Sequence, residues 1–121
     1  MEIFGFENLA AYQRAMDLVE KVYKLMKKFP SEERYALCDQ LRRAVVSVPS
    51  NIAEGLGRFS HKEEAHFIEI SYGSLMETYC QLGIAKRLNY ITQEEYEGLV
   101  EDIQNIARPL SGLYKSLNPQ P

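Results

Sequence analysis

The residues whose types and spacing come closest to a chemical site lie on one predicted helix, between residues 40 and 58. At about 100° per residue, one cation, one anion and two hydroxyls fall on one side of this helix, opposite a line of apolar residues. Such a face either lines a ligand-binding or subunit-facing surface, or pairs with a neighbouring helix and fixes its register. We favour the second interpretation, with a carboxylate of a later helix as the partner. The members of this structural polar network are Arg43, Ser47, Ser50, Glu54 and Glu77.

A Glu-x-x-His motif on a predicted helix raises the question of a metal centre. Glu63 and His66 have this spacing. A di-iron site in a four-helix bundle needs two such motifs, together with a Glu from each of the other two helices. The chain has two histidines, His61 and His66, and only His66 belongs to the motif. We therefore expect no metal ligands and no cofactor.

Serine nucleophiles are present, but the groups that would activate them are missing from the pattern. The sequence contains no Gly-x-Ser-x-Gly elbow and no glycine-rich loop for phosphate. Neither histidine is placed to activate a serine in the same predicted layer of the fold. We expect a protein without catalytic residues, which is not an enzyme.

Basic residues close to aromatic residues are the remaining signal for function, because such surfaces contact phosphates and stack on unpaired bases of RNA. Acidic residues are interleaved with these cations, and 14 Lys and Arg against 17 Asp and Glu give a formal net charge of −3. This balance argues against binding through bulk charge, and a solvated charged face is the alternative interpretation. The candidate nucleic-acid-binding residues are Arg42, Arg43, Arg58 and Lys62.

Length and composition indicate one globular domain over residues 1–121. This length suffices for a single core, and 45% hydrophobic with 26% charged residues is ordinary for a folded protein. No stretch is long and apolar enough to span a bilayer, and the first residues lack the order of a signal peptide. We expect a cytoplasmic protein with no membrane contact. Cys38 and Cys80 both fall on apolar faces, which predicts two buried free thiols.

Apolar residues at alternating steps of three and four predict four helices. Ser31 is expected to cap the second helix. Ser60 with Glu63, and Thr92 with Glu95, have the spacing of a capping box before the third and fourth helices. The predicted helices cover about residues 8–29, 32–56, 61–88 and 93–117.

Short connections between long helices force consecutive helices to run antiparallel. The fold class is therefore all-α, an antiparallel up-down-up-down four-helix bundle. Pro49 removes one backbone hydrogen bond from the second helix, so a kink is expected there. Pro109 is expected to bend the fourth helix without ending it. Gly73 and Gly83, inside the third helix, predict the close approach of another backbone.

The first helix carries two apolar seams side by side, so its apolar face is wider than one neighbouring helix needs. Two neighbours within the bundle share this face, or another copy of the protein covers part of it. One seam comprises Leu9, Tyr12, Met16, Val19, Tyr23 and Met26, and the other Ala15, Leu18, Val22, Leu25 and Phe29. The third helix has one apolar line, formed by Ile68, Tyr72, Leu75, Tyr79 and Leu82.

The central stretch also carries a recognisable set of motifs. These are SVPSNIAEG at residues 47–55, with Arg42, Arg43, Arg58, Gly73, Ser74 and Glu77 around it. The chain resembles, from residue 6 to residue 117, the four-helix-bundle proteins encoded in 23S rRNA intervening sequences. The resemblance implies an antiparallel four-helix bundle that assembles as a homo-oligomer, typically a pentameric ring. A related branch serves as the accessory protein of diversity-generating retroelements, associates with nucleic acid and reverse transcriptase, and is strongly basic where this chain is acidic.

Three functions follow as hypotheses. The first is a non-enzymatic, ring-forming helical-bundle scaffold whose partners are copies of itself and RNA. The second is a structural or protein-binding oligomer that has no contact with nucleic acid. The third and least favoured is a small-molecule or metal site inside the bundle.

Overall fold

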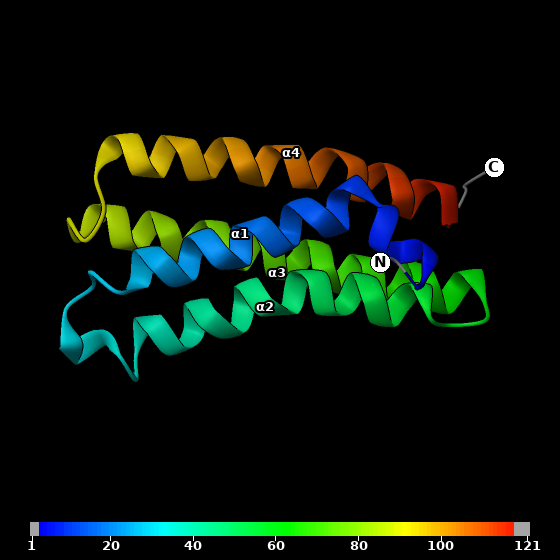
Figure 1. Ribbon diagram of the computed structural model, residues 1–121, viewed down its shortest axis with the longest axis horizontal. Helices are drawn as coiled ribbons and strands as arrows, with labels where there is room; N and C mark the ends of the chain where they lie inside the picture. Colours follow the sequence, from blue (N-terminus) through cyan, green and yellow to red (C-terminus); the bar gives the residue numbers. More distant parts are fainter. Residues whose placement is uncertain (1–2, 118–121) are drawn as a thin grey trace.

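A computed structural model describes residues 3–117 of the chain, and these residues form helices and no strands. Two short 3-10 helices, η1 and η2, precede the first and second long helices. The long helices lie side by side along the length of the molecule (Figure 1). The elements in chain order are η1 (Gly5–Asn8), α1 (Ala10–Met26), η2 (Ser31–Glu33), α2 (Leu37–Leu56), α3 (His61–Arg87) and α4 (Gln93–Leu117).

Successive helices run in opposite directions. The connections from α1 to α2 and from α3 to α4 lie at one end of the molecule, and the turn from α2 to α3 lies at the other (Figure 1). The closely packed pairs are consecutive helices and the pair α1 and α4, as a four-helix bundle requires. The predicted all-α four-helix bundle is thus confirmed.

Both helices at the first connection are shorter than predicted. α1 ends at Met26. The backbone N–H groups of the next three residues donate to carbonyls three residues earlier instead of four, including Phe29 N to the Met26 carbonyl at 3.1 Å. Pro30 disfavours helical geometry at Phe29, which explains the early end. Ser31 does not cap α2, because it begins the separate helix η2, and α2 begins only at Leu37. The Glu33 carboxylate accepts the Leu37 backbone N–H at 3.3 Å in the place of the predicted cap.

The predicted starts of α3 and α4 are confirmed. Ser60 Oγ accepts the Glu63 backbone N–H at 3.1 Å, which is one half of a capping box. Thr92 and Glu95 form both halves: Glu95 N donates to Thr92 Oγ1 at 3.0 Å, and Thr92 N donates to Glu95 Oε1 at 2.9 Å. These side chains satisfy backbone groups that a helix start leaves without partners.

Each internal proline lies within a helix that continues past it. α2 extends beyond Pro49 to Leu56, and α4 extends beyond Pro109 to Leu117, as predicted. The kink at Pro49 remains a prediction. Close to this proline, Ser71 Oγ of α3 donates a hydrogen bond of 2.8 Å to the Val48 carbonyl, so a side chain of the neighbouring helix joins the backbone of α2.

The core follows the second of the two seams predicted on α1. The buried residues of α1 are Ala11, Ala15, Leu18, Val22 and Met26. Met16 and Tyr23 of the first seam are instead 46% and 40% exposed, so the bundle does not cover them fully, and their burial against another copy stays a prediction. Tyr72 and Tyr79 of α3 are also exposed by more than a third, and Cys80 is an exposed thiol, whereas Cys38 is buried as predicted.

The close backbone approach predicted from glycines occurs at a different glycine. A Cβ atom at Gly73 would meet nothing within 4 Å, and one at Gly83 would meet only the Tyr96 hydroxyl at 3.8 Å. At Gly55 of α2, a Cβ would lie 2.7 Å from Cβ of Phe67 and 3.2 Å from the Glu64 carbonyl oxygen. Gly55 therefore allows the end of α2 to touch α3, and Gly73 leaves an open notch on the surface.

Candidate functional site

The four predicted nucleic-acid-binding residues form two separate groups in one protomer. Arg42 and Arg43 lie near the start of α2, whereas Arg58 and Lys62 follow its end. At 1.5 Å per residue, sixteen helical residues place the two groups about 24 Å apart. The structure therefore does not bring the four cations together, and a single ligand contacting both groups would need to span the length of α2.

The first group shares one carboxylate. Asp39 accepts Arg42 Nη2 at 3.4 Å and Arg43 Nη2 at 3.2 Å, both within one turn of the same helix. Arg43 projects into solvent, while Arg42 is half-buried. One negative charge shared between two guanidinium groups leaves this group with an excess positive charge.

The second group combines cations with an exposed aromatic ring. Arg58 Nη2 lies 3.0 Å from Glu54 Oε1, and the Arg58 guanidinium lies 4.6 Å from the centre of the Phe67 ring. The ring of Phe59, in the turn between α2 and α3, is fully exposed. An exposed ring beside Arg58 and Lys62 has the chemistry to stack on an unpaired base.

Only one member of the predicted polar network, a serine hydroxyl, makes a contact between α2 and α3. Arg43 pairs with Asp39 of α2, and Glu54 pairs with Arg58 just after α2. Glu77 forms no ion pair with any residue from 3 to 117. Ser50 is exposed and likewise does not join a network. Ser47 Oγ, in contrast, lies 2.8 Å from Ser74 Oγ, so one predicted member does connect α2 to α3. The ionic network expected across the two helices is therefore not made within the described protomer.

Sequence reasoning missed two residues that make polar contacts along the α2–α3 interface. Asn51 Nδ2 donates to Ser47 Oγ at 2.7 Å, and the buried Ser71 donates to the backbone of α2. The signal was the repeat of small hydroxyl residues on α3, at Ser71, Ser74 and Thr78, facing a helix with its own small residues. Small side chains let the two helices approach closely, and their hydroxyls bond across the contact.

The outer side of α3 carries a second apolar line, which the bundle leaves uncovered. Ile70, Ile84 and Leu88 are all exposed, and the notch at Gly73 and the thiol of Cys80 lie on the same line. Positions 70, 73, 77, 80, 84 and 88 follow steps of three and four, the spacing with which one helix packs along another. Glu77 is the one charged residue in this line.

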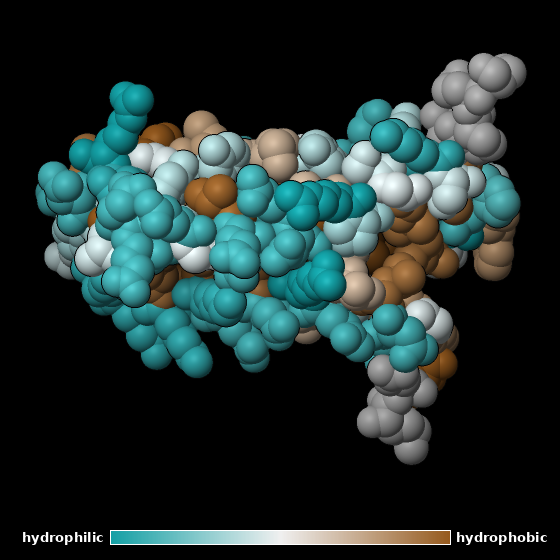
Figure 2. Space-filling view, turned by 90° about the horizontal axis from the view of Figure 1, so that it is seen from above, coloured by the Kyte–Doolittle hydropathy of each residue, from teal (hydrophilic) through white to brown (hydrophobic). Residues whose placement is uncertain are grey.

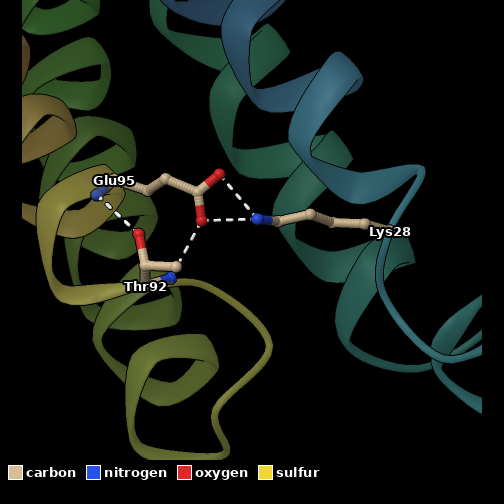
Figure 3. Close-up of polar contacts among 3 residues, drawn as sticks. All are labelled: Lys28, Thr92 and Glu95. Atoms are coloured by element: carbon tan, nitrogen blue, oxygen red, sulfur yellow. Dashed lines mark hydrogen bonds and ion pairs between the residues drawn. The ribbon is translucent and has the colours of Figure 1, made fainter.

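The side of the molecule on which α4 lies has the opposite character. Seen from above, its surface is hydrophilic over most of its length, and hydrophobic atoms gather toward the end where the termini lie (Figure 2). Ion pairs join α4 to α1 and to the turn that follows α1: Lys21 Nζ lies 2.8 Å from Asp102 Oδ2, and Lys28 Nζ of the turn donates to both oxygens of Glu95 (Figure 3). The hydrogen bond from Lys28, with that from Thr92 N, lowers the pKa of Glu95 from its ordinary value of 4.5.

Residues 3–117 contain neither a group of metal ligands nor a membrane-spanning helix. No three His, Cys, Asp or Glu side chains in this part of the chain are grouped as metal ligands. His66 of the Glu-x-x-His motif is exposed and contacts the edge of the Phe67 ring. No helix in the described part is both long enough and apolar enough to cross a membrane.

Comparison with known proteins gives the family and the fold. The family described as 23S rRNA-intervening sequence protein matches residues 7–112. A crystal structure of a protein of unknown function from Bacteroides thetaiotaomicron, of the S23 ribosomal protein family, superposes with a TM-score of 0.79 at 22% sequence identity. The match covers 88% of this chain and 99% of that chain. No curated protein sequence matches this chain significantly.

Proposed function

The chain belongs to the 23S rRNA-intervening sequence protein family, and from this premise we propose that it is a non-enzymatic scaffold that assembles with copies of itself and binds RNA. The observation that carries the proposal is the uncovered apolar line on α3. Ile70, Ile84 and Leu88 gain by burial against a second copy, at about 25 cal/mol per Å² of apolar surface removed from water. The resemblance of the sequence to ring-forming bundles supports a pentamer as the assembled state.

Repetition of modest basic groups supports the RNA-binding part of the proposal. Each protomer offers Arg42 with Arg43 at one end of α2, and Arg58 with Lys62 beside Phe59 at the other. A net charge of −3 makes a single copy a poor ligand for RNA. In a ring the same groups act together, so the effective affinity exceeds that of one protomer.

The assembly is tested by native mass spectrometry or light scattering on the protein and two variants. Ile84→Lys places a charge on the line of α3, and Met16→Lys is the matched control on α1, because these side chains are 43% and 46% exposed. We expect a pentamer that Ile84→Lys dissociates and Met16→Lys preserves. A monomeric wild-type protein would reject the scaffold, and dissociation by Met16→Lys alone would move the interface to α1.

The RNA contact is tested by titrating labelled structured and single-stranded RNA at low salt. Replacing Arg42, Arg43, Arg58 and Lys62 by glutamine should weaken binding and flatten its dependence on salt, since fewer counterions are released. A wild-type oligomer that binds neither RNA would favour the second candidate, an oligomer without nucleic-acid contact. The acidic net charge and the internal pairing of Arg43 and Arg58 are the observations in favour of that candidate.

A further inference from the structure

A cavity of about 450 Å³ opens at the corner between the end of α1 and the start of α2. Its charged side chains are all basic: Lys27, Arg34 and Arg42 line it, and no carboxylate does. Only Arg42 belongs to the basic residues singled out from the sequence. The other two come together with it because α1 ends early and η2 turns the chain back over the corner.

These three cations together carry an excess of positive charge that is available to an anion. Neither Lys27 nor Arg34 forms an ion pair with any residue between 3 and 117, and Arg42 shares its only carboxylate with a second arginine. The nearby Glu33 is already engaged, because it accepts the Leu37 backbone N–H and the Tyr90 hydroxyl, the latter at 2.6 Å. That hydrogen bond raises the pKa of Tyr90 to about 12.

Apart from Ser31, the rest of the cavity wall is apolar and aromatic. Tyr23 lies at the wall and is partly exposed, and Met26, Phe29 and Pro30 also line the cavity. The volume falls within the range of about 300–1,000 Å³ that small-molecule sites occupy. Three cations and an aromatic ring lining one cavity match a phosphate joined to a flat base.

We infer that this corner binds one nucleotide, with its phosphate held by Lys27, Arg34 and Arg42 and its base against Tyr23. The nucleotide is either free or an unpaired residue of an RNA strand. The RNA form rests on the proposed function, since it names the point at which the scaffold would hold a strand, whereas the free form does not.

The test compares two double variants that lose the same charge. Lys27→Gln with Arg34→Gln removes two cavity cations, and Lys24→Gln with Arg87→Gln removes two exposed cations that do not line the cavity. Fluorescence anisotropy follows a labelled short single-stranded RNA, and calorimetry follows a nucleoside monophosphate and its nucleoside. Circular dichroism verifies that both variants keep the helical content of the wild type.

We expect the cavity variant to bind RNA or the nucleoside monophosphate at least about tenfold more weakly than the control variant, because two charge-assisted hydrogen bonds are lost. The nucleoside without phosphate should bind poorly to all three proteins. Equal affinity of the cavity and control variants would overturn the inference.

The outcomes separate this inference from the proposed function. RNA binding that survives in the cavity variant but fails in an Arg58→Gln, Lys62→Gln variant would overturn the cavity and keep the scaffold. Binding of the nucleoside monophosphate without RNA would keep the cavity and reject RNA binding by the scaffold. Binding of neither by the wild-type protein would reject both.

A thiol inside the cavity gives a second, local readout. Cys38 lines the wall, and burial raises the pKa of its thiol above 9.0, against the opposing effect of the Arg42 guanidinium. Cys80 is exposed and serves as an internal reference. A bound nucleoside monophosphate should slow alkylation of Cys38 several-fold and leave that of Cys80 unchanged. Equal rates at Cys38 with and without saturating ligand would contradict the assigned position.

Discussion

Two helix–helix seams of this bundle, that between α2 and α3 and that between α1 and α4, are held together by different chemistry. α2 and α3 meet through a glycine and small hydroxyl residues, with Gly55 against Phe67 and Ser71 bonded to the backbone of α2. α1 and α4 meet through long charged side chains, with Lys21 and Lys28 reaching across to carboxylates. A small residue lets backbones approach, whereas a lysine bridges helices that stand further apart.

The two seams also leave different surfaces. Along α1 and α4 a groove of about 410 Å³ remains, with Lys21, Glu95 and Asp102 in its wall, and this groove suits water. Along the outer side of α3 there is an apolar line with no charged side chain except Glu77. We therefore expect the seam of α2 and α3 to carry most of the stability, and the seam of α1 and α4 to contribute little and to remain in solvent.

The largest effect is expected from Gly55→Ala. In an open helix this change stabilises by about 0.5–1 kcal/mol, because alanine is the better helix former. At Gly55 the new Cβ would lie 2.7 Å from Cβ of Phe67, so overpacking should reverse the sign and destabilise by about 1–3 kcal/mol. Urea unfolding at fixed protein concentration measures the difference.

Gly98→Ala on α4 is the matched control for that substitution. A Cβ at Gly98 would meet nothing within 4 Å, so the same chemical change should raise stability there. A gain in stability from both substitutions would show that α2 and α3 can separate without cost, and the distinction between the two seams would fail.

A smaller loss is expected from Ser71→Ala. The buried hydroxyl donates to the Val48 carbonyl across the seam, and removing one such hydrogen bond costs about 1 kcal/mol. Ser116→Ala is the control, because Ser116 is exposed and its hydroxyl bonds only to Leu113 of its own helix. Its effect should stay within about 0.5 kcal/mol. Equal losses in the two urea midpoints would mean that the bond across the seam adds nothing.

The outline of this fold could be predicted where local signals agree. In α4, the capping box at Thr92 and Glu95 and one uninterrupted apolar line point to the same helix, and the structure matches it at both ends. α1 offers two apolar seams of similar strength, and only the positions of its neighbours decide which is buried. The sequence pattern therefore left open what covers Met16 and Tyr23, and the structure shows that both are partly exposed in the protomer.

The candidate sites divide in the same way. The separation of Arg42 from Arg58 follows from helix rise alone and could have been predicted. Pairing of Arg43 with Asp39, and of Arg58 with Glu54, also follows from their four-residue spacing, which is about one helical turn. The corner cavity could not have been predicted from the sequence. It depends on α1 ending at Met26 and on the path of the chain through η2, and the residue pattern there indicated neither.

The smallest effect is expected at the charged seam, from Lys28→Ala. Lys28 Nζ lies 2.5 Å from Glu95 Oε1, but both side chains are more than a third exposed. The pair should therefore contribute only about 0.2–1 kcal/mol to stability at neutral pH. Lys24→Ala, in the last turn of α1, is the control, since Lys24 forms no ion pair with the described residues. The shift in urea midpoint caused by Lys28→Ala should be smaller at high salt than at low salt, because salt screens the pair. The shift caused by Lys24→Ala should be the same at both salt concentrations.

Acid should remove the contribution of that pair and leave the other seam unchanged. The hydrogen bond from Lys28 lowers the pKa of Glu95 below 4.5 in the folded state, so between the folded and unfolded pKa values the unfolded chain binds more protons. The stabilisation is present above 4.5 and is lost as the pH falls through the folded pKa. Lys28→Ala should thus be less stable than the wild type at neutral pH, and the two should converge in acid.

The loss caused by Ser71→Ala should persist, because no titrating side chain takes part in the bond to Val48. A loss from Lys28→Ala that is the same at both pH values would show that packing of the lysine stem, and not its charge, holds α1 to α4.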